Sequence, residues 1–226
     1  MWEVLVYKSI EANCSMRNLI FAPLGKKPDI VIDDALSNNI KIVGDTDNCL
    51  LYNFEPGADG LSWNALVDWW GSINPSENIQ RDLFMRLLES LDSKPEKDFF
   101  IQYYNIFENQ EEYPALIPQV YLHYDPHAKN WREGHAVFTH QRMDFLMLLS
   151  NSVRVVIEID GKQHYSSGDF SSPKLYAEMM MDTRELQLNG YEVYRFGGYE
   201  FLDDQKLREK IQEFFNLLFK KYSVKI

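Results

Sequence analysis

Two hydrophobic runs separated by a short polar stretch lie in the C-terminal half of the chain. The runs are Phe145–Leu149 and Val153–Ile159, and residues 150–152 between them are all polar. Polar turn residues between two runs rich in aliphatic and β-branched side chains predict a β-hairpin. Alternate residues of a strand share a face. One face is therefore expected to carry Val156, Glu158 and Asp160, and the other, which faces a core, Val155, Ile157 and Ile159.

Apolar spacing and turn residues predict further elements on both sides of this hairpin. The predicted helices are Asp29–Leu36, Ser62–Trp70, a helix from Pro75 capped by Asn74, Pro173–Asn189 and Lys206–Lys221. The predicted strands are Trp2–Tyr7, Asn18–Ala22, Ile40–Val43, Cys49–Phe54, Ile117–Tyr124 and Val193–Phe196. Residues 93–116 fit a helix or a long loop equally well. This order predicts an α/β fold in which helices flank a mixed sheet.

The stretch Gly71–Pro75 combines turn residues with a change of composition and is predicted to be a hinge. Residues 1–72 are expected to form a small N-terminal α/β domain with a sensing or interaction role. Residues 73–226 are expected to form the second domain. A chain of 226 residues is long enough for one ordinary domain and one small domain.

The carboxylates of the hairpin form a candidate metal site. Asp144 lies near the start of the first strand, at a height that faces Glu158 across the pair, and Asp160 follows two residues later. Converging carboxylates repel one another unless a cation binds between them. Oxygen ligands without a cysteine or histidine set favour Mg²⁺ or Mn²⁺ over zinc. Such a metal can hold a scissile phosphate and activate water, and Lys162 is placed to steady the developing charge.

A solvent-exposed strand end is the alternative interpretation of Glu158 and Asp160. The Val/Ile run around them and the Lys, Gln and His that follow favour the metal site.

The motif residues resemble the PD-(D/E)xK nuclease superfamily. They are Asp144 followed by Glu158-Ile-Asp160-Gly161-Lys162-Gln163-His164, and they are most similar to the branch of very-short-patch-repair endonucleases. The resemblance continues from Tyr176 to Phe196 and covers residues 75–222. It implies a restriction-endonuclease-like sheet and a Mg²⁺-dependent nuclease. Asp144, Glu158 and Asp160 would bind the metal, and Lys162, Gln163 and His164 would position water and phosphate. The resemblance also implies that the helix from Pro75 can supply an extra acidic residue, Glu77 or Asp82, with helix capping or solvent exposure as their alternative role.

The chain departs from the superfamily pattern at two positions. Met143 replaces the usual Pro, and Asp160 replaces the usual Lys, with Lys162 two residues further along. Asp160-Gly161-Lys162 is an alternative register of the motif, but Glu158 is the preferred ligand because Gly161 is expected to end the strand. The sequence leaves open whether Lys162 or His164 takes the role of the usual lysine.

Charge and composition limit the partners. The formal net charge of −11 disfavours strong binding to phosphates, which needs Lys and Arg. Weak, salt-sensitive binding or help from a partner protein is therefore expected. Cys14 and Cys49 are far apart in the sequence, no apolar run has membrane-spanning length, and the N-terminus lacks a signal-peptide layout. These features predict a cytoplasmic protein without a membrane partner.

The N-terminal stretch KPDIVIDDALSNNIKIV resembles the N-terminal domain of AbiJ-type abortive-infection proteins. That resemblance implies a role in bacterial phage defence, with a partner protein of the defence system or a homodimer. The expected activity is endonucleolytic cleavage of DNA. Two alternatives stay open: a nuclease-fold module that binds without cleaving, and an RNA-directed nuclease, because a metal site engages phosphates in either nucleic acid.

Overall fold

The computed structural model describes residues 19–25, 29–34, 39–43, 48–54, 56–121, 142–150, 152–161, 166–167 and 170–225. The helices are α1 (Trp63–Ile73), α2 (Ile79–Glu89), α3 (Lys94–Phe107), α4 (Pro173–Leu188), α5 (Asp204–Lys221) and the 3₁₀ helix η4 (Gly198–Phe201). The strands are β1 (Leu19–Phe21), β2 (Asp29–Asp34), β3 (Asn39–Val43), β4 (Leu50–Tyr52), β5 (Ile117–Tyr121), β6 (Arg142–Leu148), β7 (Arg154–Asp160), β8 (Ser166–Ser167), β9 (Phe170–Ser171) and β10 (Tyr191–Gly197). The fold is therefore mixed α/β, as the sequence predicts.

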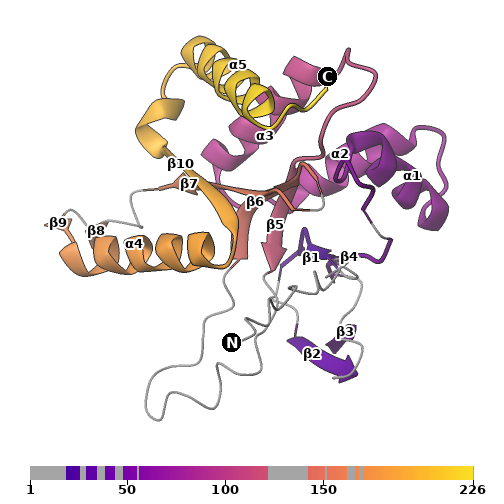
Figure 1. Ribbon diagram of the computed structural model, residues 1–226, viewed down its shortest axis with the longest axis horizontal. Coiled ribbons are helices and arrows are strands. Elements are labelled where there is room, and N and C mark those ends of the chain that lie inside the picture. Colours follow the sequence, from indigo (N-terminus) through magenta and orange to yellow (C-terminus); the bar gives the residue numbers. More distant parts are fainter. Residues whose placement is uncertain are drawn as a thin grey trace, which may run out of the picture.

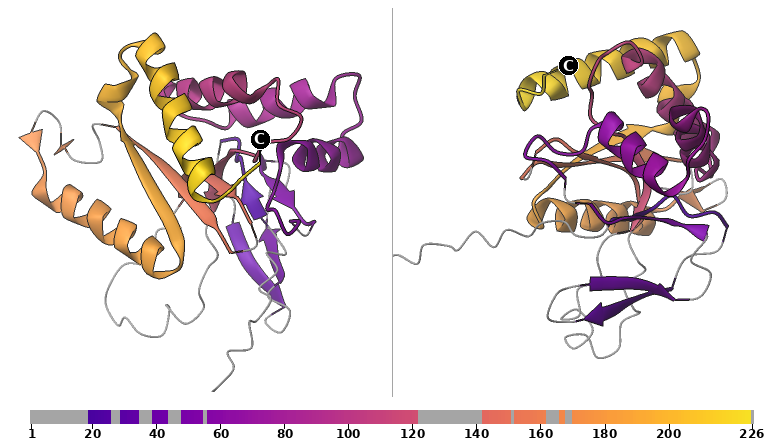
Figure 2. Two further views of the ribbon diagram at one scale, coloured as in Figure 1. Left: turned by 45° about the horizontal axis from the view of Figure 1, so that its top comes forward. Right: turned by 90° about the vertical axis from the view of Figure 1, so that its right-hand side faces the viewer.

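A four-stranded mixed sheet in the order β10-β7-β6-β5 forms the centre of the fold. Strands β5, β6 and β7 are antiparallel neighbours, and β6 and β7 are the predicted hairpin. Strand β10 is parallel to β7, which requires a crossover connection, and α4 supplies it. Figure 1 and Figure 2 show α4 against one face of the sheet and α3 with α5 against the other.

Helices therefore cover both faces, and the sheet is buried on both. On one face, Phe99 of α3 packs with ring centroids 5.5 Å from Phe145 and 5.0 Å from Phe196. Val156 was expected on the more polar face with Glu158, yet it is fully buried. That face is thus apolar at Val156 and becomes polar only toward the end of β7.

The hydrophobic core continues into the N-terminal strands. Strand β1 pairs with β4, and the backbone N–H of Ala22, just after β1, donates to Pro118 O on β5 at 3.2 Å. Trp69 of α1 and Leu83 of α2 belong to the same buried cluster. A Cβ on Gly71 would lie 2.9 Å from Ile79 Cδ1, so the predicted hinge is closely packed. One core therefore crosses the predicted boundary between residues 72 and 73.

Two predicted elements were wrong in type or position. Residues Asp29–Leu36 were expected to form a helix, but the structure has strand β2, antiparallel to β3. The successive β-branched residues at 30–32 explain the difference, because such side chains favour extended backbone. The helix expected from Pro75 begins later: Asn78 Oδ1 accepts from the Arg81 N–H and caps α2, whereas Asn74 ends α1.

The other helices lie where the sequence predicts them. Helix α4 ends at Asn189, and Gly190 follows with a φ of +83°, the left-handed conformation that terminates many helices. The ambiguous stretch 93–116 contains α3, which Ser93 caps. The predicted strand Trp2–Tyr7 lies outside the described residues. No helix in the described ranges is long and apolar enough to cross a membrane.

Candidate functional site

The hairpin brings Asp144 and Glu158 together near one end of the sheet. Phe145 pairs with Ile157, so the next residues outward on the two strands are Asp144 and Glu158. Asp144 Oδ2 accepts a hydrogen bond of 2.8 Å from the Ile159 N–H, which fixes the carboxylate against β7. Both acidic residues are partly buried among fully buried neighbours. The sheet register therefore places two carboxylates side by side at the rim of an apolar core.

Burial and mutual repulsion shift the ionisation of both groups. Burial raises the pKa of Asp144 from 3.8 to about 7, against the lowering effect of the Ile159 hydrogen bond. Burial raises the pKa of Glu158 well above its ordinary value, the Asp144 charge raises it further, and Arg195 partly opposes the rise. Two ionised carboxylates so close together repel each other at neutral pH. A bound proton or a bound cation would relieve this repulsion.

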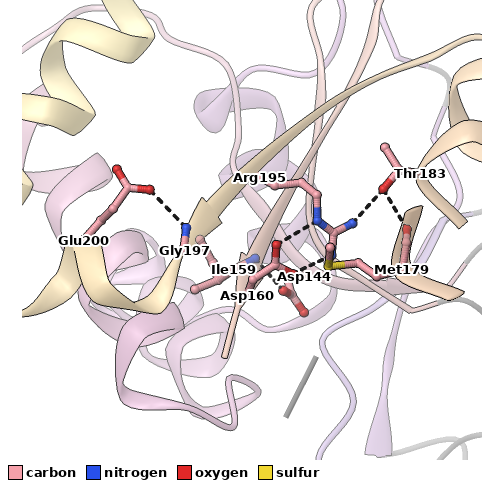
Figure 3. Close-up of polar contacts among 8 residues, drawn as sticks. All are labelled: Asp144, Ile159, Asp160, Met179, Thr183, Arg195, Gly197 and Glu200. Atoms are coloured by element: carbon pink, nitrogen blue, oxygen red, sulfur yellow. Dashed lines mark hydrogen bonds and ion pairs between the residues drawn. The ribbon is translucent and has the colours of Figure 1, made fainter. Parts of the chain in front are cut away.

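Asp160 is held differently, by an ion pair with Arg195 of β10. Arg195 Nε donates to Asp160 Oδ2 at 2.8 Å, and Nη2 donates to Oδ1. The same guanidinium donates to Thr183 Oγ1 at 3.0 Å, and this hydroxyl donates to Met179 O. Figure 3 shows Arg195 between Asp160 and α4. Both Asp160 oxygens are thus engaged, so a cation would compete with the guanidinium for them.

The turn after β10 packs closely on the end of β7. A Cβ on Gly198 would lie 3.1 Å from Asp160 O, so a side chain there would press on the backbone beside the motif. The Gly197 N–H donates to Glu200 Oε1 at 3.0 Å and holds the turn in shape (Figure 3). The ends of the two parallel strands are therefore fixed against each other.

A third carboxylate, Glu96, lies at the start of α3 and was missed by the sequence reasoning. Its residue is 8% exposed. Ser93 Oγ donates to Glu96 Oε1 at 2.7 Å, and Gln119 Nε2 donates to Oε2 at 2.8 Å. After burial and the Ile159 hydrogen bond, the Glu96 charge is the strongest influence on the pKa of Asp144, and it raises it. Glu96 therefore belongs to the same electrostatic site.

The acidic residues proposed from the sequence for this place, Glu77 and Asp82, are both exposed. One signal pointed to Glu96 instead. It stands three and four residues before Phe99 and Phe100, which are fully buried, so helical periodicity places it on the inner face of α3. The Ser93–Glu96 spacing is also that of a capping box, which explains the position without any function.

Gln119 of β5 completes the group and has an unusual backbone. Its φ is +53°, and the ladder between β5 and β6 skips it: Pro118 pairs with Phe145 and Val120 with Met143. The position opposite the gap is Asp144. Gln119 is fully buried, and its Oε1 has no hydrogen-bond partner within the described residues.

These residues fit Mg²⁺ or Mn²⁺ in their chemistry. Within the described ranges, no three His, Cys, Asp or Glu side chains are grouped closely enough to hold a metal ion. Mg²⁺ needs no such cage, because it usually keeps several waters and binds one or two carboxylates. Asp144 and Glu158 supply those two, and the unpaired buried oxygen of Gln119 is another hard donor.

The remaining predicted site residues, Lys162, Gln163 and His164, lie outside the described residues. No family model, curated protein or solved structure matches this chain. The features that bear on function are therefore the carboxylates and the order of the elements around them.

Proposed function

We propose that this chain is a metal-dependent nuclease in which Asp144 and Glu158 bind Mg²⁺ or Mn²⁺. The observation that carries the proposal is the partly buried pair of carboxylates on neighbouring strands, whose pKa values are raised chiefly by burial. A cation bound there would hold a phosphate oxygen and make a water molecule nucleophilic near neutral pH. Hydrolysis of a phosphodiester bond is the reaction that such a site serves.

The protein groups around the pair have distinct proposed tasks. The Ile159 N–H orients Asp144, and Glu96 adds negative charge that strengthens cation binding. Lys162, Gln163 and His164 follow the end of β7 and are proposed to position the water and the phosphate. Arg195 engages both carboxylate oxygens of Asp160, so the contact proposed for Asp160 is through its backbone carbonyl.

The order of elements supports a restriction-endonuclease-like fold. Helix α3 leads into three antiparallel strands, and α4 then crosses over to β10, which is parallel to β7. The candidate carboxylates lie on the two central strands of this sheet. This arrangement is compatible with the mixed sheet flanked by helices that the resemblance to PD-(D/E)xK nucleases implies.

DNA is the proposed substrate, in the setting of phage defence in the cytoplasm. The net charge of −11 makes strong binding by the chain alone unfavourable. Some basic side chains also form ion pairs with carboxylates of the chain itself. Arg195 pairs with Asp160, and Arg142 pairs with Asp92. A partner protein or a second copy of the chain is therefore proposed to contribute to DNA binding.

A binding module without cleavage is the second candidate, and the Asp160–Arg195 ion pair favours it. Asp160 stands where the superfamily has its lysine, and the Asp160 carboxylate is paired with the Arg195 guanidinium. RNA as the substrate is the further alternative, since nothing in the carboxylate pair distinguishes the two sugars.

Cleavage of supercoiled plasmid with Mg²⁺, Mn²⁺ or EDTA tests the proposal. Wild-type protein should nick the plasmid only with metal, and Glu158→Ala should abolish nicking. Glu192→Ala is the matched control, because Glu192 is an exposed strand residue paired with Lys221 away from the site. If wild type is silent on plasmid, single-stranded DNA and RNA alike, the binding module replaces the nuclease.

A further inference from the structure

Gln119 of β5 has a positive φ, a backbone conformation that residues with a side chain seldom adopt. A φ of +53° is uncommon for any residue with a Cβ, and it interrupts the ladder with β6. Residues in such conformations persist where the surroundings fix them, and they gather at functional sites. Gln119 is fully buried, so no contact with solvent explains its presence in the core.

The nitrogen and the oxygen of the Gln119 carboxamide differ in their hydrogen bonding. Nε2 donates to Glu96 Oε2 at 2.8 Å, whereas Oε1 is buried without a hydrogen-bond partner in the part of the chain that the structure describes. An unpaired buried carbonyl oxygen is costly, and native proteins rarely retain one without a water, an ion or a function. The neighbouring carboxylates, Glu96 and Asp144, make a cation the partner that suits this oxygen.

We propose that Gln119 Oε1 is a neutral oxygen ligand of the cation that Asp144 and Glu158 bind, while Gln119 Nε2 holds Glu96 outside the ligand set. This inference rests on the proposed nuclease function, because it deepens the same site. Amide oxygens are ordinary ligands of hard divalent cations. A neutral ligand also suits a site in which carboxylates already repel one another, since it adds coordination without adding charge.

Gln119 would then act in two ways. Its Nε2 holds Glu96, as Ser93 Oγ does from the other side of the same carboxylate. Its Oε1 contacts the cation, which Ser93 does not. Ser93→Ala therefore loosens Glu96 without removing a ligand, and it separates the two contributions.

Binding of Mn²⁺ to the full chain, followed by the electron paramagnetic resonance signal of free Mn²⁺, tests the assignment. Gln119→Met keeps most of the volume and removes both polar atoms, and it should weaken Mn²⁺ binding by about tenfold or more. Ser93→Ala should weaken binding less. Gln102→Met is the matched control and should bind as wild type, because Gln102 of α3 also has an unpaired buried Oε1 but forms no hydrogen bond with the site carboxylates within the described residues.

Gln119→Gly guards against a folding defect, because glycine accepts a positive φ without strain. It should fold and still lose Mn²⁺ affinity. Unchanged affinity in Gln119→Gly or Gln119→Met overturns the assignment, and so does an effect no larger than that of Ser93→Ala. Wild type that binds Mn²⁺ through Gln119 but cleaves no nucleic acid would retain this assignment and reject the nuclease. Wild type that binds no Mn²⁺ would reject both.

Discussion

Glu158 and Asp160 stand two residues apart on β7, and their charges are balanced in different ways. Asp160 has a guanidinium on both oxygens, and the ion pair joins β7, β10 and α4. Glu158 faces Asp144, another acid, and burial raises the pKa of both. The satisfied carboxylate serves the fold, whereas the unsatisfied pair is set up for a ligand. A Glu-x-Asp motif therefore contains two different roles that the spacing alone does not separate.

Breaking the satisfied pair should have the largest effect on stability. Arg195→Met takes the guanidinium away from the partly buried Asp160 carboxylate, and the free energy of unfolding should fall by about 4 kcal/mol. Urea unfolding measures the change. Lys210→Met, which breaks the more exposed pair with Glu200, should cost less than about 1 kcal/mol. Equal effects would contradict the structural role of Arg195.

The unsatisfied pair should make the metal-free protein less stable as pH rises. The folded-state pKa of Asp144 is raised to about 7 from 3.8, so the folded state binds protons more tightly than the unfolded chain. The stabilisation is complete below the ordinary value and is lost between pH 3.8 and about 7, a change on the order of 4 kcal/mol.

Urea unfolding in EDTA across this pH window measures the profile. Asp144→Asn should flatten the profile, because the amide keeps the shape of the protonated acid and does not ionise. A wild-type profile that rises with pH, or one that Asp144→Asn leaves unchanged, would contradict the pair's role.

A smaller effect should separate the third carboxylate from the pair. Glu96→Gln removes a charge that raises the pKa of Asp144, so the midpoint of the stability loss should move toward acid when all samples are kept in EDTA. The sign follows from linkage: without the Glu96 charge, the folded-state pKa of Asp144 falls, so the loss of stability ends at lower pH and is smaller. The expected result is a shift of the pH midpoint of the stability loss toward acid. A midpoint that does not move would contradict an electrostatic effect of Glu96 on Asp144.

The sequence predicted the local parts of this picture and missed the parts that depend on packing. The hairpin, α4 and α5 have strong periodic and turn signals, and the register of the hairpin sets Asp144 beside Glu158. Glu96 and Gln119 come together only because α3 folds back onto β5, a contact between residues 23 positions apart. The positive φ of Gln119 has no signature in a sequence that offers neither Gly nor Asn there.

The ion pair of Asp160 was missed for a related reason. Arg195 lies 35 positions away, and only the parallel pairing of β10 with β7 brings the two side chains into contact. The wrong helix at Asp29–Leu36 has a local cause. Proline is common in the first turn of a helix, as Pro28 would be here, but the β-branched residues at 30–32 favour a strand.

Metal-linked stability, measured together with cleavage, tests the central claim most directly. At pH 7.5, Mn²⁺ at about 100 times its dissociation constant should raise the unfolding free energy of wild type by about 2.7 kcal/mol. The same samples should then cleave nucleic acid. Glu158→Gln should show neither effect, although it keeps the volume of Glu158. Equal stabilisation of wild type and Glu158→Gln by Mn²⁺, or none in either, would contradict a metal site at the Asp144–Glu158 pair.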